Sequence, residues 1–210
     1  MTRGRAVTVT LSLLVAGGAA CGPAAARDPW APRPGPASAS WRLPEGWRTE
    51  VIPFPLAFAP TLALAGVEEL RFPPGFLEPG APGFWSYAFA WRLDRPARLS
   101  APGLAEALVT YFRGLTVAVD EGKRIADTAA ITATARTLPA GDLALDVTTY
   151  DAFKTGALVH LTGRARRVDC GGNRELWVVG LVADGAPASV RADIAALAGE
   201  AACGQTPVSE

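Results

Sequence analysis

The hydrophobic pattern of the chain is strongest at residues 84–93, which read FWSYAFAWRL. Every second position carries a large side chain, namely Trp85, Tyr87, Phe89, Trp91 and Leu93. The positions between them are mostly small. Alternation with a period of two predicts a β-strand with one bulky face and one small face. Because a buried side chain of this kind stabilises a fold by about 1.5–3 kcal/mol, we expect the core to be built on this strand.

Further segments share the period of two. Four of them follow in the second half of the chain, at 128–138, 143–150, 157–168 and 175–183. Short turns join them and leave no room for crossover helices, so they predict an antiparallel meander. Upstream, Gly66–Phe72 predicts another strand. The apolar run 50–58 is interrupted by Pro53 and Pro55, which predicts an edge strand or an extended wrap along the sheet.

Two segments have a helical pattern. Ser100 is a suitable N-cap, and Pro102 fits a first helical turn. The apolar residues that follow share one helical face: Leu104, Leu108, Tyr111, Phe112 and Leu115. We expect this face to pack on the small face of the aromatic strand, at 86–90. A second helix is predicted from Pro187 to about Cys203.

Together these elements predict one α+β domain over residues of about 41–205, followed by a short tail at 206–210. Its antiparallel β-sheet has about six or seven strands and is covered by two helices.

Residues 1–20 have the parts of a signal peptide: Arg3 and Arg5, an apolar run and then small residues. The apolar run is shorter than the roughly 20 residues of a transmembrane helix. The segment VAGGAAC, which ends at Cys21, resembles the lipobox of bacterial lipoproteins. This resemblance implies that Cys21 is acylated, with palmitate among the acyl chains, and becomes the mature N-terminus. Gly18 stands where an aliphatic residue is usual, and ordinary secretory cleavage after Ala20 or within 24–26 is the alternative.

Residues 22–40 contain five prolines and no periodic apolar pattern, which predicts a linker. In polyproline II geometry, at about 3.1 Å per residue, it would hold the domain up to ~60 Å from a lipid anchor. The chain is therefore divided into a signal peptide at 1–20, a lipidated cysteine with its linker at 21–40, and the domain.

Two cysteines remain besides Cys21, namely Cys170 at a strand end and Cys203 at the end of the last helix. Export favours oxidation, so we expect one disulfide between them. The alternative is that both thiols are buried and free.

Charge excludes one class of function. The chain has 20 basic and 20 acidic residues and no basic stripe, so we do not expect it to bind nucleic acid. The short cluster Arg164, Arg166 and Arg167 is interpreted as a solvated strand edge. Glu69 and Arg71 share a strand face and are interpreted as an exposed pair.

Candidate chemistry is sparse. The single histidine, His160, would need Asp146 or Asp151 and a serine or threonine nucleophile nearby to act in a hydrolase. No GxSxG, CxxC or HxxxH motif is present, and a lone strand histidine is more typical of a surface or half-buried position. We therefore assign no catalytic, cofactor-binding or metal-binding residue. Five of the six tryptophans precede residue 92, which indicates a core, with an exposed groove for a peptide, glycan or lipid as the alternative.

Four stretches carry a resemblance to a known group: IPFPLAFAP (52–60), GVEELRFPPG (66–75), FWSYAFAW (84–91) and YFRGL (111–115). Together they resemble a family of uncharacterised exported bacterial proteins. The order of elements is similar to the PsbP/Mog1-like α-β-α sandwich. The resemblance implies no site residue.

We expect a cell-envelope lipoprotein, attached to the membrane by its lipid, that binds or supports an envelope protein or ligand. A hydrolase using His160 and an untethered secreted binding protein are the alternatives.

Overall fold

The computed structural model describes residues 41–121, 123–125 and 127–204. The signal peptide, Cys21 with its linker, and the tail at 206–210 lie outside the described residues. No helix within the described ranges is long and apolar enough to cross a membrane.

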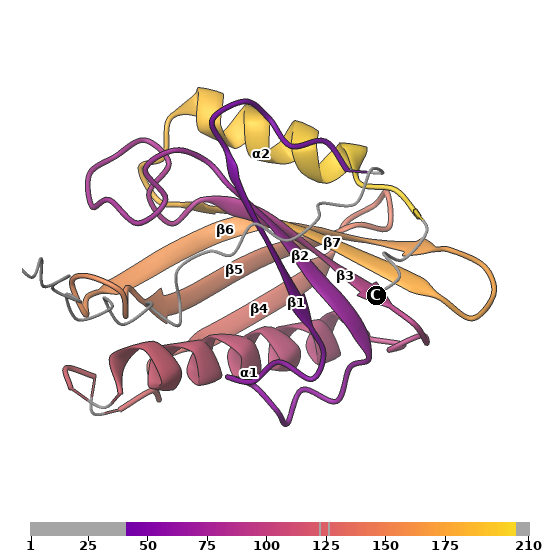
Figure 1. Ribbon diagram of the computed structural model, residues 1–210, viewed down its shortest axis with the longest axis horizontal. Helices are drawn as coiled ribbons and strands as arrows, with labels where there is room; N and C mark the ends of the chain where they lie inside the picture. The colour runs from indigo at the N-terminus through magenta and orange to yellow at the C-terminus, as the bar shows by residue number, and fades with distance from the viewer. Residues whose placement is uncertain (1–40, 122, 126, 205–210) are drawn as a thin grey trace, which may run out of the picture. The chain divides into compact units, whose positions relative to one another are not determined.

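Seven antiparallel strands form one sheet in the order β1-β2-β3-β7-β6-β5-β4 (Figure 1). Their bounds are Arg48–Pro53 (β1), Gly66–Phe72 (β2), Tyr87–Leu93 (β3), Thr132–Thr137 (β4), Leu143–Tyr150 (β5), Leu158–Asp169 (β6) and Glu175–Ala183 (β7). Two helices, α1 (Ala101–Asp120) and α2 (Ala188–Glu200), complete the domain. The α+β class is confirmed, and the aromatic strand β3 lies near the middle of the sheet between β2 and β7.

The two helices lie on opposite sides of the sheet (Figure 1). Leu104, Leu108 and Phe112 of α1 pack in one core cluster with the bulky face of β3. Ile194 and Leu197 of α2 pack in a second cluster with Ala88 and Ala90 on the small face. The prediction that the first helix packs on the small face is therefore wrong.

The reason lies in what surrounds each face. On the bulky side, β5 adds Leu145 and Val147 to the same apolar surface, which is large enough for the aromatic stripe of α1. On the small side, β2 presents Glu69 and Arg71. A helix rich in alanine, such as α2, fits closely beside that mixed surface, whereas Tyr111 and Phe112 of α1 need an apolar one.

The sequence predicts an edge strand or a wrap for the proline-rich segment, and the segment forms both in turn. β1 pairs only with β2 at the sheet edge, and Leu56 and Ala59 beyond it are buried in the aromatic core. Gly114 of α1 allows the wrap to lie against the helix, because a Cβ there would be 2.1 Å from the Phe58 carbonyl oxygen. The wrap therefore closes the bulky face next to α1.

The disulfide is confirmed. Cys170 follows β6 and Cys203 follows α2, with their Cα atoms 5.4 Å apart. The bond fixes the end of α2 to the β6–β7 hairpin.

Candidate functional site

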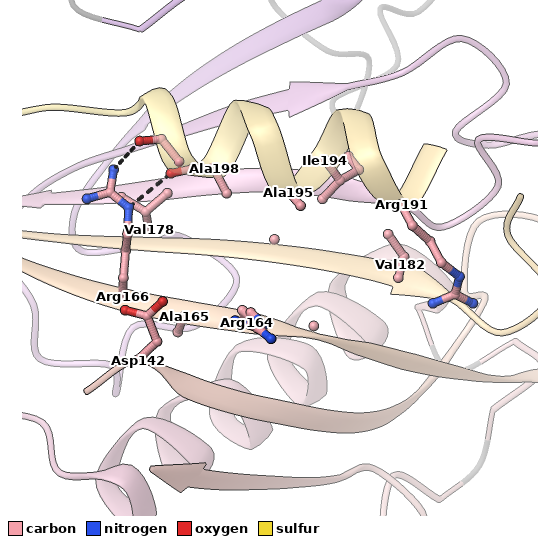
Figure 2. A pocket seen from close by; sticks show the side chains of 13 residues that line it. Asp142, Arg164, Ala165, Arg166, Val178, Val182, Arg191, Ile194, Ala195 and Ala198 are labelled. Atoms are coloured by element: carbon pink, nitrogen blue, oxygen red, sulfur yellow. Dashed lines mark hydrogen bonds between the residues drawn. The ribbon is translucent and has the colours of Figure 1, made fainter. Parts of the chain in front are cut away.

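A groove runs between α2 and the sheet. The helix packs mainly on β7 and β3, so the same face of β6, β5 and β4 is left without a helical cover. At this boundary the surface is hollowed, with a volume of about 440 Å³ (Figure 2). That volume is within the range of about 300–1,000 Å³ that is typical of small-molecule sites.

The groove has an apolar floor and a wall of small residues. Val178 and Val182 of β7 line its floor, and Ala195 and Ala198 line the wall on α2. Gly180 lies beneath the helix, where a Cβ would be 3.0 Å from the Ile194 Cγ2 atom. Small side chains on both elements therefore bring α2 close to the sheet and leave the hollow along its outer side.

Arg166 ties one end of the groove to the C-terminus of α2. Its Nε donates to the carbonyl oxygen of Ala198 at 3.1 Å, and its Nη2 donates to that of Gly199 at 3.2 Å and also to that of Ala201 (Figure 2). Carbonyl groups in the last turn of a helix have no partner within the helix and carry partial negative charge. The guanidinium of Arg166 satisfies several of them, so its hydrogen bonds are largely used within the fold.

Arg191 has a similar role at the other end. Its Nε donates to the carbonyl oxygen of Ala186 at 3.1 Å and its Nη2 to that of Ala183 at 3.2 Å. Its Nη1 lies 3.4 Å from the Thr162 hydroxyl oxygen. Arg191 therefore holds the β7–α2 connection in place.

Arg164 differs from these two arginines. It lies on β6 between them along the groove, and its side chain is exposed (Figure 2). Within the described part of the chain it makes no hydrogen bond or ion pair. Asp142 is the carboxylate among the lining residues, and no ion pair joins it to Arg164 there. The groove thus combines an aliphatic surface with one guanidinium that is free to bind an anion.

The predicted arginine cluster is therefore not simply a solvated edge. Alternation along β6 places Arg164 and Arg166 on the groove side, whereas Arg167 lies on the other face and pairs with the buried Glu175. The strand's alternation separates the three arginines, which the sequence analysis treats as one cluster, and the groove itself depends on where α2 lies.

Of the partners proposed for His160, a threonine and Asp146 lie on its own face of the sheet, whereas Asp151 does not. His160 is exposed on the uncovered sheet face, and its Nδ1 lies 3.0 Å from the Thr148 hydroxyl oxygen. Asp146 is exposed on the same face, opposite Thr162. Asp151 is buried on the bulky side, where it accepts hydrogen bonds from Trp85 Nε1 at 3.2 Å and from the Thr155 amide and hydroxyl at 2.9 and 2.8 Å.

Asp151 thus shapes its own loop and does not orient the imidazole of His160. His160 does not line the groove beside α2, and no group of three or more His, Cys, Asp or Glu side chains gathers as a metal site among the described residues.

Glu69 and Arg71 are paired but not exposed, so the interpretation of a solvated pair is wrong. Glu69 Oε1 lies 2.6 Å from Arg71 Nη2, and Glu69 Oε2 lies 2.9 Å from Arg92 Nε, with all three side chains buried. The guanidinium of Arg71 also stacks on the Trp41 ring at 4.5 Å. Trp41 in turn donates to the carbonyl oxygen of Leu197 at 2.8 Å. Trp41 and α2 together cover Glu69 and Arg71, and both are far from these two residues in the sequence.

A second buried acid lies on the opposite face. Glu68 is fully buried and accepts hydrogen bonds from Trp91 Nε1 at 3.0 Å and from the Tyr111 hydroxyl at 3.4 Å. Burial raises the pKa of Glu68 to about 8, although both hydrogen bonds favour the charged form. The sequence analysis does not identify Glu68 as a core residue. Its alternation with Leu70 and Phe72 was the available signal that it faces the core. Its acidic side chain, however, suggested a position in contact with solvent.

The tryptophans support the core interpretation. Trp41, Trp85, Trp91 and Trp177 are all buried, and the lining of the groove is aliphatic rather than aromatic.

Comparison with known proteins gives no match to any family model, any curated protein or any solved structure.

Proposed function

We propose that this protein is an exported lipoprotein of the cell envelope, tethered through Cys21, that acts as a binding or accessory module rather than as a catalyst. The signal-like residues 1–20, the lipobox-like segment before Cys21 and the linker after it support the tether. The linker would let the domain bind its partner at a distance from the membrane.

The groove beside α2 carries the binding part of the proposal. It is concave and apolar, and it holds a guanidinium at Arg164 that is not used in folding. Sites for small ligands typically combine an apolar surface with a few polar groups that fix orientation. This groove has both features.

The placement of the acid and base groups favours binding over catalysis. A hydrolytic site needs a nucleophile, a base and an orienting group within hydrogen-bond reach in a cleft. His160 lies on an open surface with Thr148, and Asp151 is committed to its own loop on the other side of the sheet. Asp146 is on the same face as this pair, but none of the three residues lines the groove, so the arrangement supports binding more than hydrolysis.

Native mass spectrometry of the exported chain tests the proposal. We expect the full chain with Cys21→Ser to be exported without an acyl group, so that no detergent is needed. Ala195→Leu, added to it, fills the groove. Ala192→Leu is the matched control, because Ala192 is exposed on the same helix but does not line the groove.

We expect the unfilled chain and the Ala192→Leu control to retain a non-covalent ligand that the Ala195→Leu variant lacks, and His160→Ala to leave this ligand unchanged. Identical spectra for the two leucine variants would contradict a binding role for the groove.

A further inference from the structure

We infer that the groove beside α2 binds an aliphatic chain that carries one anionic head group, a carboxylate or a phosphate. The head group pairs with Arg164, and the chain lies along the outer side of α2, over β6 and the adjoining part of β7. This inference rests on the proposed binding role of the groove and names its ligand class.

The apolar surface fits an alkyl chain. Apart from three arginines and Asp142, the groove is lined by valine, isoleucine, alanine and glycine and by no aromatic ring. Stacking of flat rings against aromatic side chains has no platform here. Ala195 and Ala198 of α2 instead offer accessible aliphatic contacts above the buried Val182, and the helix of 13 residues is about 20 Å long.

The backbone around the groove offers few hydrogen bonds to a ligand. β6 and β7 are interior strands, each paired on both sides, so their amide and carbonyl groups are used in the ladder. The last carbonyl groups of α2 are bound by Arg166. An extended peptide binds a sheet chiefly through main-chain hydrogen bonds at a free strand edge. Its own amide groups would remain unpaired in this groove, whereas an alkyl chain has none to satisfy.

Charge selects the head group. Arg166 and Arg191 are held by backbone carbonyl oxygens, and Asp142 is the carboxylate among the residues that line the groove. Arg164 is left with its donors free among the described residues, at mid-length of the groove (Figure 2). A guanidinium binds a carboxylate or a phosphate through two parallel hydrogen bonds. One free guanidinium beside an apolar surface therefore suits an amphiphile with a single anionic head.

Titration calorimetry on the full chain exported with Cys21→Ser tests this ligand class. The probes are decanoate and decyl phosphate, each below its critical micelle concentration. Decyltrimethylammonium has the same chain with a cationic head, acetate has the head without the chain, and a short peptide of alternating Asp and Val represents an acidic peptide.

We expect decanoate and decyl phosphate to bind, with decyltrimethylammonium at least about tenfold weaker and acetate without measurable binding. The tighter of the two alkyl anions identifies the source of the head group as a fatty acid or a phosphate-bearing lipid. Arg164→Gln should weaken both by about tenfold, because a hydrogen bond to a charged group is lost. Arg136→Gln is the matched control: it removes the same charge from the same sheet face outside the groove and should leave affinity unchanged.

Ala195→Leu should abolish binding of the alkyl anions, and Ala192→Leu should not. Equal binding of decanoate and decyltrimethylammonium, or equal effects of the two arginine variants, would overturn the inference. The inference would also be overturned if the acidic peptide bound more tightly than the alkyl anions and its binding depended on Arg164. The groove would then be a binding site for another class of ligand. In each of these outcomes, the native mass spectra decide whether the binding role stands. A ligand that is retained by the Ala192→Leu control and lost in Ala195→Leu would show that the groove binds a ligand although the inferred ligand class is wrong.

Discussion

The two neighbouring acids of β2 show how one strand places equal side chains in different surroundings. Glu68 points into the aromatic core, and Glu69 points to the opposite face, where two arginines meet it. A buried carboxyl group without a cationic partner favours its neutral form, whereas one that is paired with guanidinium groups favours its charged form. Removing the carboxylate of Glu68 should therefore increase stability, whereas removing that of Glu69 should decrease it.

Glu68→Gln should stabilise the protein above neutral pH. The pKa of Glu68 is about 8 in the folded state, against an ordinary value of 4.5, so folding favours the protonated form. Its contribution to stability is fully present below about pH 4.5 and is lost as the pH rises to about 8, by roughly 3–5 kcal/mol. The glutamine variant avoids this loss. Denaturant unfolding of both proteins at pH 5 and pH 8.5 measures the free energy of unfolding. The increase caused by Glu68→Gln should be larger at pH 8.5.

Glu106→Gln is the control for this experiment, because Glu106 is exposed on α1. Its effect on the free energy of unfolding should be the same at both pH values. A Glu68→Gln effect that is equally independent of pH would show that the carboxyl group is charged in the folded state.

Glu69→Ala should destabilise the protein by about 3–5 kcal/mol, because it leaves Arg71 and Arg92 buried without the carboxylate that they share. Glu45→Ala removes an exposed acid of the same chain and should change the free energy of unfolding by less than about 0.5 kcal/mol. Chemical denaturation at pH 7 measures both variants. A Glu69→Ala variant as stable as Glu45→Ala would mean that the cluster does not hold the fold together.

At the scale of elements, the disulfide joins two segments that local pairing does not connect. Cys170 and Cys203 are 33 residues apart, so reducing the bond frees a loop that includes β7 and α2. In the chain-entropy model, a disulfide that closes a loop of this length stabilises the folded state by about 3–4 kcal/mol. We expect Cys170→Ser with Cys203→Ser to lower the free energy of unfolding by about this amount in thermal or chemical unfolding. An oxidised protein that is no more stable than this double variant would contradict the prediction.

Local patterns predicted the strands well and the covering of the sheet poorly. The period of two in 84–93 and in the meander is set by which side each residue faces, and every strand so predicted is present. Which helix covers which face depends on contacts between distant segments. The sequence therefore supports two helices on a sheet, but it did not place α1 on the bulky face.

The candidate site was predicted only in part, for the same reason. The arginines of β6 were visible in the sequence, but their division between a groove and a buried partner depends on α2 and on Glu175. Glu69 and Arg71 were predicted to share a face, yet their burial follows from Trp41, which is 30 residues from Arg71 in the chain. His160 had no motif around it, and the structure adds no partner beyond Thr148 to it among the described residues.

At the scale of the whole molecule, the proposal joins a groove to a membrane tether. An amphiphile-binding module at the end of a proline-rich linker would be held near a membrane, which is where such ligands are found. Cys21→Ser should move the protein from the membrane fraction to the soluble exported fraction of its host, because the proposed anchor is attached to this single residue. Fractionation followed by immunodetection measures this, with Ala192→Leu, which keeps Cys21 and the disulfide, as the control.

The intact mass of the mature protein, taken from the membrane and soluble fractions of its native host, tests the central claim most directly. We predict a membrane-bound form that begins at Cys21 and carries the added mass of acyl chains. A soluble form without acyl chains, beginning at or after Cys21, would contradict the tether and would make the domain a free secreted protein with a diffusible ligand.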